Sequence, residues 1–360
     1  MDHFEKHFQS NKASEYFLRI EAKQKTNKNL IPKGHIIAKE QFKIPFSKPA
    51  SPVDDSFAKS TLKYKTIENN LYIEGPDFLA VFDIQKGHLN NYVYNEHSML
   101  KKPLHLDFWR MPTSNDIGNK MHERLATWKS INSKQQLTSF KIDTISKQQI
   151  KIQTSSKLLE PNANFNLNYT IFSNGEIYVD FKMEITDKIF PEMPRIGLNL
   201  TIPAKFENMA WFGRGPHKTY WDRKTGADIG LYNGKVIEQY VPYIFPQENG
   251  NKTDVRWASF VDAKNNGWLI VGDEPLNIAA YPYEQEQLSA FKNAVEVTFQ
   301  DIVEVHIDLQ QMGVGGDNSW GEHTLEKYKL LNNTYQFGFW LKPVSNKTNT
   351  HEKSKVVLKN

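Results

Sequence analysis

The chain has 360 residues, of which 45 are basic and 41 acidic, so its formal net charge of +4 is weak for its length. No basic stripe is interleaved with aromatic residues, which argues against nucleic acid as a partner. The lack of cysteine excludes disulfides, cysteine-ligated zinc and a cysteine nucleophile, but it does not distinguish cytoplasm from periplasm.

The start of the chain carries no targeting signal. Residues 1–8 are charged and lack the apolar core of a signal peptide, and no later apolar stretch is long enough to cross a bilayer. We therefore expect no membrane partner. Nothing in the sequence assigns a compartment, and we slightly prefer the cytoplasm to the periplasm.

The first 46 residues predict part of a β-sandwich. Tyr16, Leu18 and Ile20 alternate with other residues as in a strand, and residues 34–43 add one or two further strand-like runs. An immunoglobulin-like sandwich needs about seven strands over roughly 100 residues. Residues 1–46 are therefore expected to be its C-terminal half, so that the chain begins inside a domain.

Composition divides the rest of the chain. Residues 47–60 are rich in Pro, Ser, Asp and Lys without periodicity and predict a linker. A large domain is expected over 61–343. Residues 344–360 form a polar tail without a pattern, which we expect to be poorly ordered.

The region 61–343 is predicted to be mostly β. Apolar residues alternate over 165–171 and 177–185, and Asn174-Gly175 between them predicts a hairpin. The same dipeptide occurs at 233–234, 249–250 and 266–267. Only residues 121–130 indicate a short helix, and the alternation of strands and helices that a TIM barrel requires is missing.

Residues 313–321, Gly-Val-Gly-Gly-Asp-Asn-Ser-Trp-Gly, predict a glycine-rich turn with an aromatic residue near its tip. Alternating residues at 303–309 predict a half-buried strand that leads into this turn. Glycines let the backbone approach a ligand, and the flat face of Trp320 suits the C–H side of a pyranose. The alternative is that Trp320 fills a core.

Five ordered blocks resemble the C-terminal region of the large β-galactosidases of glycoside hydrolase family 2. They are Phe-Trp-Arg-Met-Pro-Thr-Ser-Asn-Asp-Ile-Gly at 108–118, Pro-Arg-Ile-Gly at 194–197, and the blocks at 211–223, 246–257 and 313–321. The chain departs from the family at Met111, Ser114 and Trp221, where Ala, Asp and Pro are usual, which leaves substrate preference open. The resemblance implies an all-β chain, with a large galactose-mutarotase-like β-supersandwich after the partial immunoglobulin-like sandwich.

The resemblance also implies a function shared with a partner. In this family the two catalytic glutamates of a retaining glycosidase lie on a TIM barrel, which this sequence lacks. The chain is therefore expected to be the C-terminal part or small subunit of a β-galactosidase acting on terminal β-D-galactosides such as lactose, and to be inactive alone. Its partners would be a barrel-bearing large subunit, the galactoside and further copies in an oligomer. No cofactor is expected on this chain, whereas the complete enzyme would use a divalent cation (Mg or Ca) and Na.

Seven site residues follow from the same resemblance, and no catalytic residue and no metal ligand is among them. Trp320, with Asp317 and Asn318, would contact the substrate. Residues matching a mobile loop beside the active-site mouth are Asn115, Asp116, Gly118 as a hinge and Arg124 as a latch to the barrel.

Each of these residues has a structural alternative. Asp317, Asn318 and Ser319 suit a turn whose side chains bond their own backbone. Arg110, Asn115 and Asp116 suit a buried polar corner. Two further functions also stay open, a stand-alone carbohydrate-binding module and a mutarotase-like aldose epimerase using His and Glu, for which His105, His217 and His306 are the histidines to consider.

Overall fold

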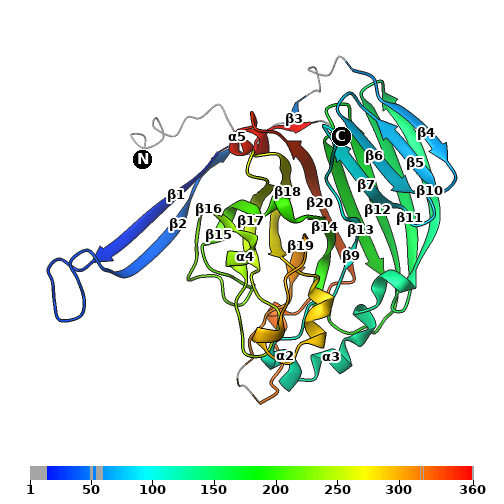
Figure 1. The fold of residues 1–360 in the computed structure, drawn as a ribbon. Coiled ribbons are helices and arrows are strands. Elements are labelled where there is room, and N and C mark those ends of the chain that lie inside the picture. The colour runs from blue at the N-terminus through cyan, green and yellow to red at the C-terminus, as the bar shows by residue number, and fades with distance from the viewer. Residues whose placement is uncertain (1–13, 49–51, 54–59, 317, 319, 359–360) are drawn as a thin grey trace. The chain divides into compact units, whose positions relative to one another are not determined.

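The computed structural model describes residues 14–48, 52–53, 60–316, 318 and 320–358. The chain divides into two compact units, Met1–Asp55 with His351–Lys359, and Ser56–Thr350 (Figure 1). Most of the regular structure in both units is β-strand, so the predicted all-β class is confirmed. None of the described helices is long and apolar enough to span a membrane.

The first unit is built around an antiparallel hairpin of β1 (Ser14–Lys23) and β2 (Ile36–Lys48). The region 34–43, where one or two strand-like runs are predicted, belongs to the single strand β2, which runs through Pro45. Proline is tolerated there because a register shift between Ser14 and Tyr16 leaves Pro45 without a paired partner.

The tail also contains regular structure that its composition did not predict. Helix α5 (Thr350–Ser354) is followed by β21 (Val357–Leu358), which pairs in parallel with β3 (Pro52–Val53). β3 lies within the predicted linker 47–60, of which residues 49–51 and 54–59 lie outside the described residues. Two-residue strands are too short for an alternating pattern to reveal them.

A long sheet of antiparallel pairs forms most of the second unit. Its strands, in spatial order, are β10 (Gln135–Ser146), β11 (Gln149–Leu159), β12 (Asn162–Phe172), β13 (Ile177–Ile185), β20 (Thr334–Val344), β18 (Gly267–Tyr281), β17 (Lys252–Val261), β15 (Asn208–Gly215) and β16 (Asp228–Lys235). From β18 the sheet also continues through β19 (Ile302–Gln311) and β14 (Arg195–Pro203) to β9 (Lys102–Asp107). The sheet therefore branches at β18.

A smaller sheet of five strands packs against the long one. It consists of β4 (Lys63–Ile67), β5 (Asn70–Glu74), β6 (Phe78–Asp83), β7 (His88–Tyr94) and β8 (His97–Ser98). Phe82 meets Tyr169 with ring centroids 4.9 Å apart, and Tyr92 meets Trp268 at 4.8 Å. These buried aromatic pairs close the sandwich that the sequence predicts.

The Asn-Gly dipeptides mark two hairpins and not four. Asn174-Gly175 joins β12 to β13 with Gly175 at φ +86°, and Asn266-Gly267 joins β17 to β18. Asn233-Gly234 instead lies inside β16, where it pairs with β15. Asn249-Gly250 lies in the loop before β17. Strand pairing therefore overrides the turn preference of the dipeptide at 233–234.

Helices are short and lie mainly in the second unit. The predicted helix at 121–130 is present as α3 (Met121–Arg124) and the 3₁₀ turn η1 (Ala126–Trp128), with Leu125 and Trp128 fully buried. The others are α2 (Ser114–Gly118), α4 (Val236–Gln239), η2 (Ile131–Lys134), η3 (Ala204–Phe206), η4 (Gln285–Ala290), η5 (Ala294–Glu296) and η6 (Glu326–Tyr328). α2 and α3 lie at the end of the unit that the segment after β19 also reaches (Figure 1).

Candidate sugar-binding turn and the polar network behind it

The chain leaving β19 is held by a buried arginine. Arg110 donates from Nη1 to the carbonyl of Met312 at 2.6 Å and from Nη2 to the carbonyl of Gly313 at 2.8 Å. Asp116 holds the same guanidinium through Nε at 3.1 Å and Nη2 at 2.9 Å. Both side chains are almost fully buried, so this two-bond ion pair fixes the first residues of the turn.

Helix α2 contributes the next contact to the turn. Thr113 caps the helix in a capping box, in which its hydroxyl accepts from the amide of Asp116 and Asp116 accepts from the amide of Thr113. The adjacent Asn115 donates from Nδ2 to the carbonyl of Val314 at 3.0 Å. Asn115 therefore contacts the turn directly and Asp116 acts through Arg110, which is the arrangement of the buried polar corner, while their role in a mobile active-site loop stays a prediction.

Two residues that the sequence did not single out for this site also fix the turn. Asp222 accepts from the amide of Gly315 at 2.7 Å, and Thr324 donates to the carbonyl of Gly313 at 3.2 Å. Gly321 has φ +125°, and a Cβ there would lie 2.9 Å from the carbonyl oxygen of Gly118. Only glycine fits at Gly321 without a shift, so Gly118 and the turn are in close backbone contact.

Trp320 is 90% exposed, so it does not fill a core. Its backbone amide donates to Oδ1 of Asn318 at 2.8 Å, which is the turn-forming contact considered for Asn318. Asp317 lies outside the described residues. So exposed an indole does not stabilise the unit by packing. Its free flat face is available for stacking on a ligand.

Arg124 is occupied within the chain. Its guanidinium donates to Oε1 of Glu192 at 2.8 Å and to the carbonyl and side-chain oxygens of Asn119 at 3.0 and 3.1 Å. Asn119 also caps α2 directly after Gly118. The arginine thus braces the loop that Gly118 ends, and its role as a latch to a barrel stays a prediction.

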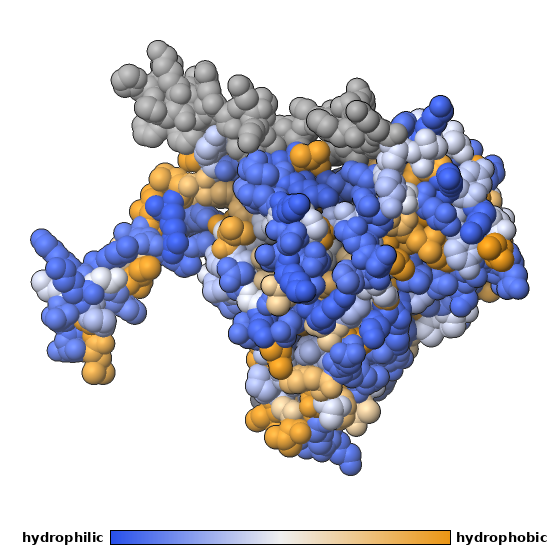
Figure 2. Space-filling model, turned by 45° about the horizontal axis from the view of Figure 1, so that its top comes forward, coloured by the Kyte–Doolittle hydropathy of each residue, from blue (hydrophilic) through white to orange (hydrophobic). Residues whose placement is uncertain are grey.

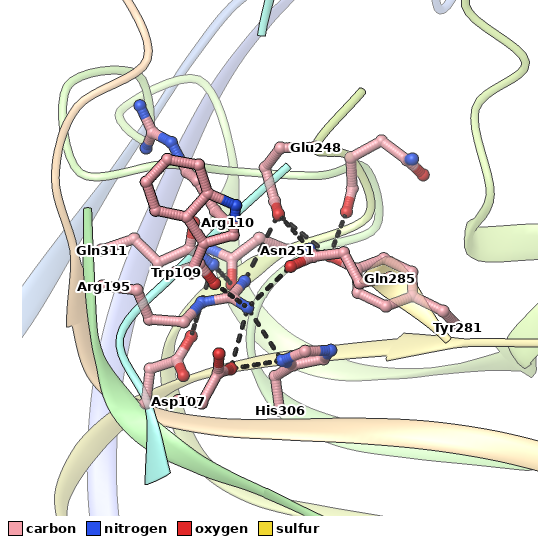
Figure 3. A network of polar contacts seen from close by, with 12 residues as sticks. Asp107, Trp109, Arg110, Arg195, Glu248, Asn251, Tyr281, Gln285, His306 and Gln311 are labelled. Carbon is pink, nitrogen blue, oxygen red and sulfur yellow. Dashed lines mark hydrogen bonds and ion pairs between the residues drawn. The ribbon is translucent and has the colours of Figure 1, made fainter. Parts of the chain in front are cut away.

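Behind the turn, Arg195 is enclosed by carboxylates (Figure 3). Its guanidinium lies 2.9 Å from Asp107, 3.1 Å from Asp308 and 3.4 Å from Glu248. Glu248 also accepts from the hydroxyl of Tyr281 at 2.9 Å. Arg195 and Asp308 have no exposed surface, so these bonds replace the water that both charges have lost.

His306 extends this network along β19. Nδ1 lies 2.5 Å from Asp107 and Nε2 lies 2.7 Å from Glu304. The prediction of a half-buried strand with a polar outer face is therefore wrong, since Glu304, His306 and Asp308 are all buried. Alternation marked the two faces of the strand correctly, but it could not show that the polar face is covered as well.

The cluster contains four carboxylates, Asp107, Glu248, Glu304 and Asp308, and two cations, Arg195 and His306. Burial and these neighbouring charges shift the pKa values of His306, Asp107 and Asp308. Burial and Arg195 lower the pKa of His306, but Asp107 and Glu304 outweigh them and raise it to about 9. Burial raises the pKa of Asp107, but Arg195 and His306 outweigh it and hold it well below its usual range. Burial, together with the negative charges of Asp107 and Glu248, raises the pKa of Asp308 to about 8 against the lowering effect of Arg195 and His306. A proton kept on Asp308 reduces the buried negative charge.

Polar residues of the blocks at 211–223 and 246–257 have partners within the chain. Arg214 lies 2.5 Å from Asp254, which also pairs with Lys224 at 2.7 Å. Gln247 accepts from the amide of Ser114 at 3.1 Å, which joins the block at 246–257 to α2. These contacts indicate that polar residues of the two blocks serve to hold the fold together.

Two family models match the chain in sequence order. Residues 3–45 match β-galactosidase domain 4, and residues 74–341 match the β-galactosidase small chain. The chain belongs to the β-galactosidase small chain family. Its relatives include the β-galactosidase of Priestia megaterium, 37% identical over 93% of this chain, and that of Pseudoalteromonas haloplanktis, 30% identical over 91%. The small chain described here spans only about a third (32%) of the length of either relative.

Solved structures with which this small chain aligns include two sugar epimerase-like proteins. One is a galactose mutarotase-like protein from Clostridium acetobutylicum, with a TM-score of 0.43 at 12% identity, covering 80% of this chain and all of that one. Another is the galactose 1-epimerase of Lactobacillus acidophilus, with a TM-score of 0.40 at 7% identity, covering 80% of this chain and 99% of that one.

Proposed function

We propose that this small chain is the C-terminal part of a β-galactosidase whose catalytic glutamates lie on a barrel supplied by the rest of the enzyme. The match to domain 4 followed by the small chain supports this proposal, as does the span of a third of the relatives' length. The isolated chain would not hydrolyse galactosides. In the retaining mechanism, the two carboxyls about 5–5.5 Å apart would both come from the partner region.

The exposed Trp320 carries the proposed role in binding. In the assembled enzyme it would form one wall of the sugar site, stacking on the C–H face of the galactoside or its leaving group. The hydrogen bonds from Arg110, Asn115 and Asp222 hold the turn in place before the substrate arrives, which limits the entropy lost on binding. Asn318 would act through the turn, by bonding the amide of Trp320.

The hairpin of the first unit supplies the proposed assembly surface. Leu18, Ile20, Ile37 and Phe42 are between 49% and 62% exposed, and apolar residues are spread along the hairpin in Figure 2. Two strands alone bury too little apolar surface to be stable in water. We assign their cover to the remainder of the domain 4 sandwich, which would continue into the barrel-bearing part and link the chain to it.

Metal ions are assigned to the same remainder. In the part of the chain that the structure describes, no group of three or more His, Cys, Asp or Glu side chains is arranged to hold a metal. The Mg or Ca and Na ions expected for the complete enzyme would therefore be bound by partner residues, and no step proposed for this chain depends on them.

The epimerase alternative requires a histidine that can exchange a proton with a sugar. Of the three candidates, His306 is the most enclosed, and both of its ring nitrogens are occupied, by Asp107 and Glu304. An imidazole with both nitrogens bonded to carboxylates has no free position for the ring oxygen of a sugar. This geometry argues against His306 as that histidine.

The test is reconstitution with a barrel-bearing partner, prepared from the N-terminal two thirds of the Priestia megaterium relative. The mixture should hydrolyse a chromogenic galactoside, whereas neither part should do so alone. Trp320→Ala should lower kcat/KM of the mixture about tenfold, as expected for an aromatic contact of about 1–2 kcal/mol. Trp320→Phe, which keeps an aromatic ring, is the matched control and should lose less.

Because Trp320 is exposed, both variants should leave the unfolding midpoint of the chain unchanged. If the purified chain alone hydrolyses the galactoside, and replacing one of its own carboxylates abolishes this activity, the proposal that the catalytic glutamates lie on the partner is refuted. Equal activity of the Trp320→Ala and unaltered mixtures would refute the role of the indole.

A further inference from the structure

A cavity of about 550 Å³ opens over β9, β14 and β19, and Trp320 is not among its lining residues. Its volume lies within the range of about 300–1,000 Å³ typical of small-molecule sites. The strand register builds its floor. Asn199 on the middle strand pairs with His105 on one side and His306 on the other. Two positions along, Thr201 lies between Lys102 and Glu304 in the same way.

These six side chains all line the cavity, so one face of three adjacent strands carries polar groups where a sandwich normally buries apolar ones. The opposite face of β14 is apolar, with Leu198, Leu200 and Ile202 in the core. A face this polar is stable only where its groups find partners, within the protein or from a ligand.

One buried group on this floor has no partner. Oδ1 of Asn199 makes no hydrogen bond among the described residues, although the side chain is only 8% exposed. In addition, the contacts of Asp107 and Glu304 use Oδ2 and Oε1, while the structure assigns no contact to their second oxygens. The cavity thus offers hydrogen-bond acceptors to a ligand that carries several donors.

The walls of the cavity add flat apolar surface. Phe108, Trp109 and Phe245 line it together with Ile117 of α2. Its charges nearly balance, since the carboxylates Asp107, Glu284, Glu286 and Glu304 are accompanied by the cations Lys102, Lys129 and His306. Acceptors on the floor, aromatic rings on the walls and a small net charge together fit a neutral polyhydroxylated ligand better than an ion.

We propose that this cavity binds a neutral monosaccharide, at a second carbohydrate site separate from the one that Trp320 serves. The sugar hydroxyls would donate to Asn199, Asp107 and Glu304, and its C–H face would rest on the aromatic wall. Arg195 pairs with Asp107 and His306 pairs with Glu304, which holds both acceptor carboxylates in position.

Calorimetry on the full chain tests this directly, with D-galactose and D-glucose as probes. The chain carrying Trp320→Ala should bind at least one of them in a 1:1 ratio with a dissociation constant of about 1 mM or lower. Asn199→Leu removes the unpartnered acceptor at nearly constant side-chain volume, so it should weaken sugar binding about tenfold. The unfolding midpoint should be retained or rise, because Oδ1 of Asn199 makes no hydrogen bond that the substitution would remove.

A second variant does not touch the buried network. Ser289 is exposed at the rim of the cavity, so Ser289→Trp should close the mouth and abolish binding. Gln287→Trp, on the same helical turn η4 but outside the lining, is the matched control and should bind like the parent. The proposal fails if neither sugar binds, if Trp320→Ala alone removes binding, or if Asn199→Leu and Ser289→Trp bind as the parent does.

Discussion

The two ends of strand β19 differ in the side chains that they place inside and outside the protein. One end carries charged side chains into the interior, and the other leads to an apolar side chain in solvent. Glu304 and His306 carry charge into the interior beside the protonated Asp308, and Arg195 and Asp107 enclose them. Beyond Gln311 the same chain continues into a turn that leaves an indole in solvent. Burying charge opposes folding and is offset here within the chain, whereas leaving an indole in solvent contributes nothing to folding.

The two ends of β19 are therefore expected to affect different properties, namely stability at the buried end and ligand binding at the exposed end. The ion network is buried and its charges are offset by its own members, so removing a member should show in stability. Trp320 contributes nothing to the unit that holds it, so removing it should show only in binding. Stability and binding measurements on variants of the two regions therefore test the comparison directly.

The largest effect is expected at Arg195. Arg195→Met would leave Asp107, Glu248 and Asp308 buried without their shared cation, and breaking a buried ion pair in this way costs about 3–5 kcal/mol. The free energy of unfolding from a urea titration measures the loss. If Arg195→Met unfolds at the parent's midpoint, the network is not what stabilises this end of the sandwich.

Two matched variants sharpen that result. Arg214→Met removes a half-buried guanidinium whose partner Asp254 keeps Lys224, and should cost only about 1–2 kcal/mol. Asp308→Asn mimics the protonated acid that its raised pKa implies, so it should be tolerated at neutral pH better than Asp107→Asn. Equal losses from the two aspartate variants would contradict the assigned proton.

A smaller effect is expected at the exposed end of the strand. Gly321→Ala would place a Cβ 2.9 Å from the carbonyl oxygen of Gly118, at a φ of +125° that alanine rarely adopts. The strain, about 1–2 kcal/mol, should move the turn and lower kcat/KM of the reconstituted enzyme. Gly226→Ala, with nothing within 4 Å of its Cβ, is the control. Similar kinetics of the two variants would show that the position of Trp320 is not set by this contact.

The sequence predicted several strands and a helix from their periodicity. It did not predict which polar side chains are buried by neighbouring elements. Alternation identified β12, β13 and β19, and helix spacing identified α3. It failed where one element covers another: the polar face of β19 is buried because β9 and β14 complete an ion network there. Partners such as Asp222 for Gly315 are distant in sequence, and no local pattern points to them.

The smallest effect is expected in the pH dependence of the unaltered chain. The pKa of His306 is raised to about 9 from 6.5, so its stabilising effect is complete below pH 6.5 and disappears as the pH rises through 9. Burial, with Lys218 nearby, lowers the pKa of Lys252 to about 7 from 10.5, so its destabilising effect is complete below pH 7 and disappears as the pH rises from 7 to 10.5. Between pH 7 and 9 the two trends oppose each other.

Unfolding free energies measured at pH 8, 8.5 and 9, above the raised pKa of Asp308, should therefore change by less than about 1 kcal/mol in the parent chain, although each group alone gives a slope of up to about 1.4 kcal/mol per pH unit. His306→Gln removes the falling trend, so its stability should rise with pH. Lys252→Met removes the rising trend, so its stability should fall. Parallel slopes in the two variants would mean that His306 is not held as a cation between Asp107 and Glu304, and the buried end of β19 would then lack the charge balance that distinguishes it from the exposed turn.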